Sequence, residues 1–300
     1  MAILRPKKKK AEEAKVETPE VEVPSLSTAL PQRIYDAYIL NLDGTAFHGE
    51  MLMPGVDRIL KTAEHMRRPV MFKTTDPHLT SEEYARILSS VGVEVEPSQI
   101  ISPASIAIRY LDRMHPGAAV YAIASDSMRA ELEAGGVKLT DDPKEIDVVL
   151  VSHDRNFNFE KLNIAYEAIS VEKRALLVTT SMSRRRYLPD GTTEPGTAAI
   201  VAAIEAATKT KASKNLGSPA TDVLEAILEK IQVAPEDAIL VSDSLAADIR
   251  MARAFGMPAA LVLTGESTRE QAAAAKKKEQ PNFVIDHVEE ILPAYIVDQI

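Results

Sequence analysis

The sequence predicts an α/β protein with a doubly wound parallel sheet, and three observations support this class. From Ile34 onward, short β-branched runs alternate with longer amphipathic runs, as in consecutive strand–helix–strand units. The run at 238–242 is apolar up to its last residue, as expected of a parallel strand that is covered on both faces. Polar residues follow several of the strands, at the positions where such sheets bind their ligands.

The individual elements follow from hydrophobic periodicity. Strands are predicted at 35–41, 69–74, 119–123, 147–152, 175–179, 238–243, 259–263 and 282–285. Helices are predicted at 55–66, 81–91, 103–114, 126–135, 159–170, 197–208, 220–232, 246–255, 268–278 and 287–295. The carboxyl ends of parallel strands meet at one edge of the sheet, so functional side chains are expected in the loops after residues 41, 74, 217 and 242.

The chain is predicted to contain a tail and two domains. Residues 1–33 are rich in Lys, Glu and Pro and lack periodicity, so we expect a disordered tail. Its run Lys7–Lys10 is interpreted as solubilising, with contact to an acidic partner or a membrane surface as the alternative. Residues 34–116 and 195–300 are expected to form one core domain. Residues 117–194 have βα units of their own and are expected to form a second α/β domain inserted into the first.

Composition and charge limit the classes of function that the chain can have. The chain has 300 residues, of which 45% are hydrophobic and 26% are charged, as in ordinary globular proteins. The net charge of −9 argues against general nucleic-acid binding. Cysteine is absent, which excludes disulfides and thiolate metal sites. No apolar run approaches the roughly 20 residues that span a bilayer, and the start of the chain does not resemble a secretory signal. The default expectation is therefore a cytoplasmic protein that does not bind membranes.

Four polar segments follow predicted strands, and the first is the most informative. They are Asn41-Leu42-Asp43-Gly44-Thr45, Lys73-Thr74-Thr75-Asp76, Gly217-Ser218-Pro219, and Ser242-Asp243 followed by Asp248. Alternate residues of a strand share a side, so Asn41 and Asp43 can converge at the mouth of their strand. A phosphoryl-transfer site of this layout requires a carboxylate at the first position, and this chain has an amide there.

The ordered set of segments resembles the haloacid dehalogenase superfamily over about residues 35–292. The similarity is greatest to NagD-type and phosphoglycolate or 4-nitrophenyl phosphatase-like proteins, which carry a large α/β cap between the second and third motifs. The resemblance implies a Rossmann-like core domain and identifies the insert as that cap. It also implies Mg²⁺ as a cofactor and a homodimer formed through the cap.

The resemblance assigns roles to several residues. Asp43 matches the general acid and base of the family, which protonates the leaving group and then activates water. Thr74, with Thr75 beside it, matches the phosphate-binding position. Asp243 and Asp248 match the acidic metal-binding positions, and together with residues 41 and 43 they form the predicted Mg²⁺ ligands.

Two positions depart from the family pattern. Asn41 stands where the family has the aspartate that attacks phosphorus, and an amide cannot form the acyl phosphate. Asn41 can offer Mg²⁺ a carbonyl oxygen but no charge, so metal binding is expected to be weakened. Ser218 stands where the family has a lysine that balances the charge of nucleophile and phosphate. Each loss is expected to cost at least about a hundred- to thousand-fold in rate.

We therefore predict a pseudophosphatase, a catalytically inactive phosphatase-like protein that acts by binding a protein partner or a ligand. The alternative is an active Mg²⁺-dependent hydrolase that dephosphorylates a small phosphate monoester, using Asp43 or a recruited lysine. A third interpretation treats Asn41 and Ser218 as engineered substitutions in an active enzyme. It is less consistent with the sequence, because the second and fourth motifs also depart from the family pattern.

Other charged residues and two histidines are further candidates for the site. Lys73 is expected to point to the side of its strand opposite Thr74, so Lys214 is the better candidate for the missing positive charge. Arg184–Arg186 is interpreted as a solvated charge run, with an anion or partner site as the alternative. His48 and His153 fit no metal spacing and are expected at the surface or in loops.

The acidic residues near the strand ends lead to an expectation about charge. Asp43, Asp76, Asp243 and Asp248 could converge in one pocket. Without a lysine, such a pocket is expected to favour a cation over a phosphate. Where no cation binds, repulsion between like charges is expected to raise the pKa of one carboxyl group.

Overall fold

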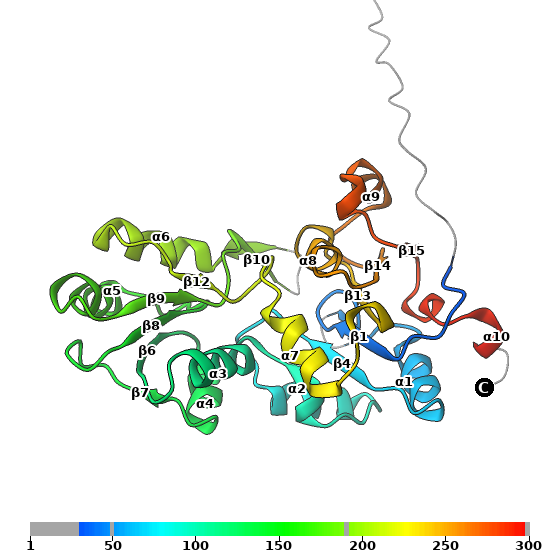
Figure 1. The fold of residues 1–300 in the computed structure, drawn as a ribbon, viewed down its shortest axis with the longest axis horizontal. Helices are drawn as coiled ribbons and strands as arrows, with labels where there is room; N and C mark the ends of the chain where they lie inside the picture. The colour runs from blue at the N-terminus through cyan, green and yellow to red at the C-terminus, as the bar shows by residue number, and fades with distance from the viewer. Residues whose placement is uncertain (1–29, 49–50, 189–191, 298–300) are drawn as a thin grey trace, which may run out of the picture.

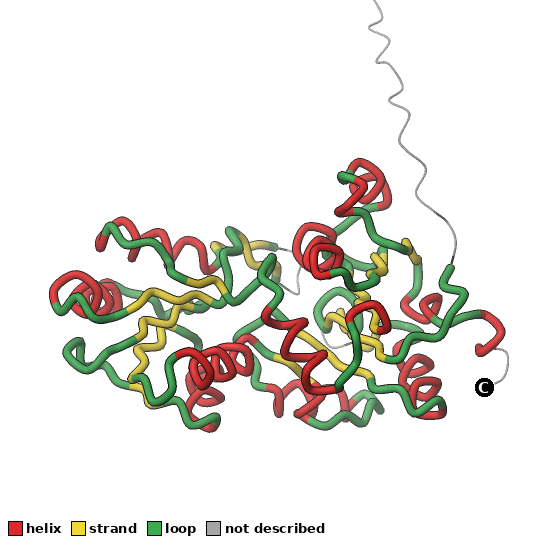
Figure 2. Tube along the Cα trace, in the orientation of Figure 1, coloured by secondary structure: helices red, strands yellow, loops and turns green. Residues whose placement is uncertain are grey.

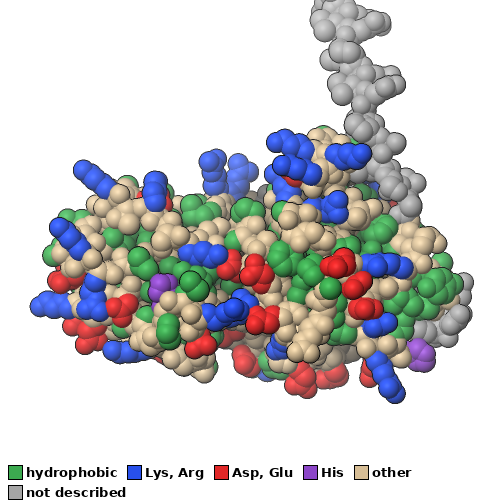
Figure 3. All heavy atoms as spheres, viewed as in Figure 1, with side chains coloured by type: hydrophobic (Ala, Val, Ile, Leu, Met, Phe, Trp, Pro, Cys, Tyr) green, Lys and Arg blue, Asp and Glu red, His purple; other side chains and the backbone are tan. Residues whose placement is uncertain are grey.

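The computed structural model describes residues 30–48, 51–188 and 192–297 (Figure 1). Two parallel sheets lie along the long axis of the molecule, each flanked by helices (Figure 2). On the face shown in Figure 3, acidic and basic side chains are interspersed. The predicted disordered tail lies almost wholly outside the described residues, since 1–29 are not among them. No helix within the described ranges is long and apolar enough to cross a bilayer.

The core sheet has six parallel strands in the order β15-β14-β13-β1-β4-β5. Their bounds are Ala37–Asn41 for β1, Val70–Lys73 for β4, Ile100–Ile101 for β5, Ala238–Ser242 for β13, Ala259–Val262 for β14 and Phe283–Ile285 for β15. The central strand β1 has every residue buried, as a strand covered on both faces must. Its neighbours are β13 and β4, so these three strands place their carboxyl ends side by side.

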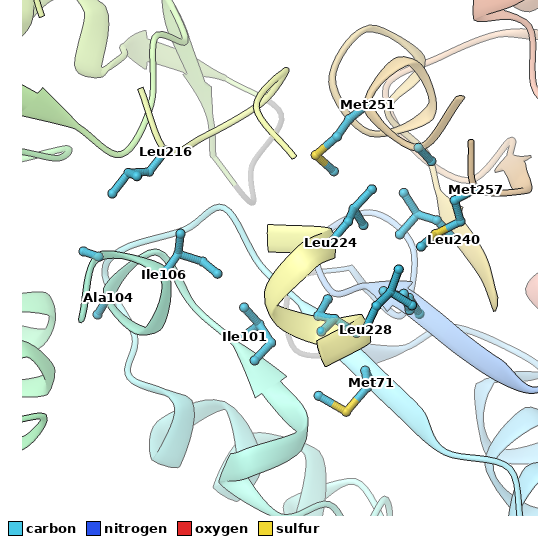
Figure 4. Close-up of a cluster of buried hydrophobic side chains, with 14 of the residues drawn as sticks. Met71, Ile101, Ala104, Ile106, Leu216, Leu224, Leu228, Leu240, Met251 and Met257 are labelled. Carbon is cyan, nitrogen blue, oxygen red and sulfur yellow. The ribbon is translucent and has the colours of Figure 1, made fainter. Parts of the chain in front are cut away.

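Helices cover both faces of this sheet. Their bounds are Val56–His65 for α1, Ser81–Ser90 for α2, Asp222–Ile231 for α7, Arg250–Phe255 for α8, Arg269–Ala274 for α9 and Ala294–Val297 for α10. Because strand side chains alternate, Ile39 enters the cluster that contains Leu224 of α7, whereas Leu40 enters the cluster that contains Ile59 of α1. Figure 4 shows part of the first cluster, where Leu224 and Leu228 of α7 project toward the sheet.

The second sheet has five parallel strands in the order β12-β9-β8-β6-β7. The strands are β6 (Ala119–Ile123), β7 (Lys138–Leu139), β8 (Val148–Val151), β9 (Leu176–Thr179) and β12 (Lys214–Asn215). Its helices are α3 (Pro103–Met114), α4 (Asp126–Ala134), α5 (Phe159–Tyr166) and α6 (Thr197–Thr208). Two antiparallel hairpins complete the fold, namely β2 (Phe47–His48) with β3 (Met51–Leu52), and β10 (Arg185–Tyr187) with β11 (Thr193–Pro195).

The predicted exit of the inserted domain at residue 194 lies too early. Helix α6 packs against α5 and β8, and β12 then pairs with β9 in parallel. A parallel neighbour requires a crossover helix, and α6 is that crossover, so the second sheet continues to Asn215.

Several predicted helices also differ from the structure. The helix predicted at 159–170 ends in a π-helical turn at Glu167–Val171, and the one predicted at 246–255 begins with one at Leu245–Ile249. The helix predicted at 268–278 ends at Ala274, and the one predicted at 287–295 is split by Pro293, which cannot continue a helix.

The carboxylate of Glu131 forms one of the contacts between the inserted domain and the core. Glu131 of α4 accepts hydrogen bonds from the Oγ atoms of Ser81 (2.9 Å) and Ser102 (2.8 Å). Ser81 begins α2 and Ser102 caps the N-terminus of α3, so one side chain contacts the starts of two helices. Burial raises the pKa of Glu131, although the serine hydroxyls act in the opposite direction.

Candidate active site

The carboxyl ends of β1, β4 and β13 bring the predicted residues together. Asn41 is the last residue of β1, and Asp43 follows it two residues later. Thr74 follows β4, and Asp243 follows β13. The pleat and the strand order account for this convergence, because the central strand has the other two as its neighbours.

The amide of Asn41 lies at the centre of a hydrogen-bond network. Its Oδ1 accepts from Lys73 Nζ at 2.9 Å. Its Nδ2 donates to the backbone oxygen of Asp43 at 2.7 Å and lies 3.4 Å from Asp243 Oδ1. The residue is only 7% exposed. Position 41 therefore borders positions 43 and 243, as the sequence predicted for a site residue.

The expectation that Lys73 points away from the site is wrong. Its side chain is buried, and its ammonium lies between Asn41 Oδ1 and Asp248 Oδ2, at 2.9 and 2.7 Å. Lys73 is the register partner of Asn41 in the parallel pair of β4 and β1, so the two side chains share a face. Strand alternation no longer applies to Thr74, because β4 ends at Lys73. Both residues can therefore reach the site.

Both carboxylate oxygens of Asp243 accept hydrogen bonds from neighbouring residues. Its Oδ1 accepts from Thr45 Oγ1 at 3.0 Å, and its Oδ2 accepts from the backbone N–H of Glu266 at 3.0 Å. Two glycines permit this close packing. A Cβ atom would lie 2.4 Å from Asp243 Oδ2 at Gly44, and 2.0 Å from it at Gly265. Gly44 also has a φ of 76°, which favours glycine.

Asp248 contacts Lys73 and belongs to the π-helical turn Leu245–Ile249. Its Oδ2 accepts from Ser242 Oγ at 2.7 Å and from Lys73 Nζ at 2.7 Å. Its Oδ1 is buried and has no hydrogen-bond partner among the described residues. The carboxylate therefore depends on the lysine ammonium as its counter-charge inside the protein.

Asp43 and Thr74 form the outer part of the site. Thr74 Oγ1 donates to Asp43 Oδ2 at 2.9 Å and accepts from the backbone N–H of Asp76 at 3.0 Å. Tyr84 Oη lies 3.1 Å from the same threonine oxygen. Sequence reasoning missed Tyr84, since it lies within a helix that the periodicity explains by packing alone. Burial raises the pKa of Tyr84 well above its usual value, and Asp43 and Asp76 add to the rise, so its phenol keeps its proton.

Two carboxyl groups of the site have raised pKa values, where the sequence predicted a rise for one. Removal from water is the larger cause for both Asp43 and Asp243. The Asp76 carboxylate adds to the rise in the pKa of Asp43. Asp43 as a whole residue remains exposed to solvent, so water moderates the effect there. Repulsion between carboxylates is thus the smaller cause, contrary to the expectation.

Several sequence candidates lie away from this network. Ser218 Oγ contacts Met251 Sδ at 3.8 Å, so residue 218 adds no polar contact to the site. Lys214 pairs with Asp222 at 2.9 Å and does not supply the missing charge. Thr75 is exposed, next to Thr74. Of His48 only the backbone is described.

The hairpin β10–β11 of the inserted domain reaches the rim of the site. Arg186 donates to Asp76 Oδ2 at 2.7 Å and to Glu194 Oε1 at 2.9 Å. The interpretation of Arg184–Arg186 as a solvated run is therefore wrong for Arg186, which is about one-fifth exposed. The other two arginines are exposed.

A histidine pair lies beside this contact. His78 Nε2 of the core is 2.8 Å from His153 Nδ1 of the inserted domain, and His153 Nε2 is 3.1 Å from the backbone oxygen of Pro195. His153 is buried and lies in a loop, which is one of the two places predicted for it. Burial lowers the pKa of His78, which favours its neutral form.

Comparison with known proteins shows the family of this chain. The family model described as haloacid dehalogenase-like hydrolase matches residues 38–138, and the model described as HAD-hydrolase-like matches residues 215–291. Human chronophin is 30% identical over 275 residues, which cover 87% of this chain and 90% of chronophin. The chain belongs to the haloacid dehalogenase-like hydrolase family. The fold is that of the family, with parallel sheets flanked by helices.

Two solved structures of haloacid dehalogenase-like hydrolases are informative. The 4-nitrophenylphosphatase of Thermotoga maritima is 26% identical, has a TM-score of 0.79, and covers 86% of this chain and 96% of its own. A glycerol phosphate phosphatase of Mycobacterium tuberculosis, in complex with magnesium, is 24% identical with a TM-score of 0.75. The match covers 86% of this chain and 77% of that phosphatase.

The residues predicted as Mg²⁺ ligands in this haloacid dehalogenase-like hydrolase do not surround a common point. The carboxylate of Asp43 is bonded to Thr74, and that of Asp248 is turned toward Lys73. The Asn41 amide nitrogen stands between Asp43 and Asp243. Across the described ranges, no group of three or more acidic or histidine side chains is placed to hold a metal ion. The carboxylates, as they are arranged, do not by themselves form a site for a divalent cation.

Proposed function

We propose that the protein binds a small phosphate monoester at the strand ends and does not hydrolyse it by the covalent route. The single observation that carries this proposal is the amide at position 41. Asn41 lies beside Asp43 and Asp243, where a nucleophile would have to stand. An amide is neutral and cannot attack phosphorus to form an acyl phosphate.

The ligand class is supported by the relatives and by Lys73. The similar structures include a 4-nitrophenylphosphatase and a glycerol phosphate phosphatase, both named for phosphate monoesters. Lys73 places an ammonium within the site, so the expected bias against a phosphate is reduced. Thr74 and Asp43 face each other at its outer part, where the threonine hydroxyl can turn from Asp43 and donate to a phosphoryl oxygen.

The second candidate is an active Mg²⁺-dependent phosphatase, and two observations favour it. The relatives are named as phosphatases. Lys73 also supplies the positive charge expected from residue 218, so only one of the two departures from the family pattern remains a chemical loss. In this case water must attack phosphorus directly, with Asp43 as the general base. The names of the relatives favour this candidate, whereas the chemistry of residue 41 favours the first.

A five-protein assay separates the two candidates. Wild type, Asp43→Asn, Asn41→Asp, Ser218→Lys and Asn41→Asp/Asp43→Asn are assayed with 4-nitrophenyl phosphate, a panel of small phosphate esters and Mg²⁺. We expect turnover only in Asn41→Asp, at least about 100-fold above wild type, because Lys73 already supplies the cation. Ser218→Lys should gain nothing, since its side chain lies beside Met251.

Binding is measured on the wild type by calorimetry with the same esters. Saturable binding without turnover supports the first candidate. Metal-dependent turnover by wild type that disappears in Asp43→Asn establishes the second candidate. A wild-type protein that neither binds nor hydrolyses any of the esters contradicts both candidate functions.

Two further predictions are compatible with a binding role. They are a protein partner and a homodimer formed through the inserted domain. A pull-down with and without residues 1–33 tests the partner. Light scattering coupled to size-exclusion chromatography tests the dimer.

A further inference from the structure

The orientation of the Asn41 amide is determined by its partners. A lysine ammonium has only donors, so the atom that faces Lys73 at 2.9 Å must be the amide oxygen. The amide nitrogen then faces the backbone oxygen of Asp43 and a carboxylate oxygen of Asp243. Both of these atoms are acceptors, so the network is consistent in one orientation only.

The two oxygens at the amide nitrogen are of the kind that bind divalent cations. Mg²⁺ and Ca²⁺ take carboxylate and backbone carbonyl oxygens as ligands. A carboxylate at position 41 would turn a third oxygen toward Asp43 O and Asp243 Oδ1, and three such oxygens repel one another unless a cation lies between them. The N–H bonds of the Asn41 amide bring partial positive charge to the same place.

Two further carboxylates of the site already have partners within the protein. Asp248 has the ammonium of Lys73 as its counter-charge. Asp243 accepts hydrogen bonds from Thr45 and from the backbone of Glu266. Because Gly44 and Gly265 pack tightly against Asp243 Oδ2, little space is left on that side for a hydrated ion.

We propose that the Asn41 amide and the Lys73 ammonium together take the place of a divalent cation, so that the centre is assembled without metal. Mg²⁺ and Ca²⁺ then have no tight site at these strand ends. The inference does not depend on the proposed function, since it concerns the assembly of the centre and not the fate of a phosphate ester.

Thermal unfolding of three proteins tests this proposal. Wild type, Asn41→Asp and Asn215→Asp are unfolded in EDTA, in 10 mM Mg²⁺ and in 10 mM Ca²⁺. Asn215 is the matched control, because its Nδ2 also donates to the backbone oxygen two residues later, at 3.0 Å on Gly217, and its other side-chain hydrogen bonds among the described residues are with backbone atoms. We expect no metal effect on Tm in wild type or in Asn215→Asp. Asn41→Asp should have a lower Tm in EDTA and should regain at least about 4 °C with Mg²⁺.

A second measurement needs no variant. Mn²⁺ is titrated into ¹⁵N-labelled wild type, and the side-chain amide signals are followed by NMR. We expect the Asn41 signals to stay sharp at Mn²⁺ concentrations below 1 mM, on the order of the weakest specific calcium sites. Broadening of these signals there, or a Tm rise in wild type equal to that of Asn41→Asp, overturns the proposal. A failure of Mg²⁺ to stabilise Asn41→Asp also overturns it, because the strand ends then contain no latent cation site.

Discussion

The Lys73 side chain shows how one buried charge organises the strand ends. Its ammonium compensates Asp248, whose carboxylate is 2% exposed. We predict that Lys73→Met lowers the free energy of unfolding by about 3–5 kcal/mol, because it leaves Asp248 charged and unpaired inside the protein. Urea denaturation measures the loss. Lys214→Met is the control and should cost no more than about 1 kcal/mol, since its pair with Asp222 is more exposed.

The double variant Lys73→Met/Asp248→Leu tests whether the uncompensated charge of Asp248 causes the loss of stability in Lys73→Met. It removes both charges and should recover a large part of the loss. A double variant that is less stable than Lys73→Met would show that Lys73 contributes mainly by packing.

At the same scale, the sequence predicted only part of the site. The convergence of Asn41, Asp43, Thr74 and Asp243 follows from strand ends and the pleat, which are visible in the sequence. The place of Lys73 depends on its register with Asn41, and a single strand does not reveal the register of its pairing. The ion pair between Lys73 and Asp248 was missed for this reason.

Helix α4 carries one of the contacts between the two domains, and this contact is sensitive to pH. The folded pKa of Glu131 is raised, so the folded protein holds the proton more tightly than the unfolded chain does. The free energy of unfolding is therefore highest below the usual glutamate pKa of 4.5 and falls as pH rises toward the folded pKa, after which it levels off.

We predict that Glu131→Gln removes this decrease. The glutamine oxygen can still accept from Ser81 and Ser102, and it carries no charge at any pH. Tm is measured from pH 4 to pH 8 for wild type, Glu131→Gln and the exposed control Glu133→Gln. Wild type should lose Tm relative to Glu131→Gln over this range. Parallel Tm profiles for wild type and Glu131→Gln would contradict the raised pKa of Glu131 in the folded protein.

The elements that the sequence predicted well are the long periodic ones. Helices at 103–114 and 197–208 match α3 and α6 at both ends. The missed strands have only two or three residues, such as β5 and β12, and their pairing comes from tertiary contacts that short runs do not encode. The early domain exit has the same origin, because β12 is the last strand of the second sheet.

At the scale of the whole molecule, Arg186 ties the inserted domain to the rim of the site. We predict that Arg186→Gln speeds hydrogen exchange in residues 74–80 and in the hairpin β10–β11 by about 5–30-fold, as a local loss of about 1–2 kcal/mol implies. The reason is the loss of its ion pairs with Asp76 and Glu194. Mass spectrometry measures the exchange, and Arg185→Gln is the exposed control. Unchanged exchange in these segments would show that other contacts hold the domains together.

The pairing of His78 with His153 has a consequence for the protein in mild acid. Only one proton fits between their facing nitrogens at 2.8 Å, so a second proton sets two donors against each other. Because the folded pKa of His78 is below 6.5, the contact is fully stable above that pH and weakens as pH falls toward the folded pKa. The Tm advantage of wild type over His153→Gln should therefore shrink between pH 7.5 and pH 5. Mild acid would thus loosen one contact between the two halves of the molecule without any ligand, while the Glu131 contact responds to pH in the opposite direction.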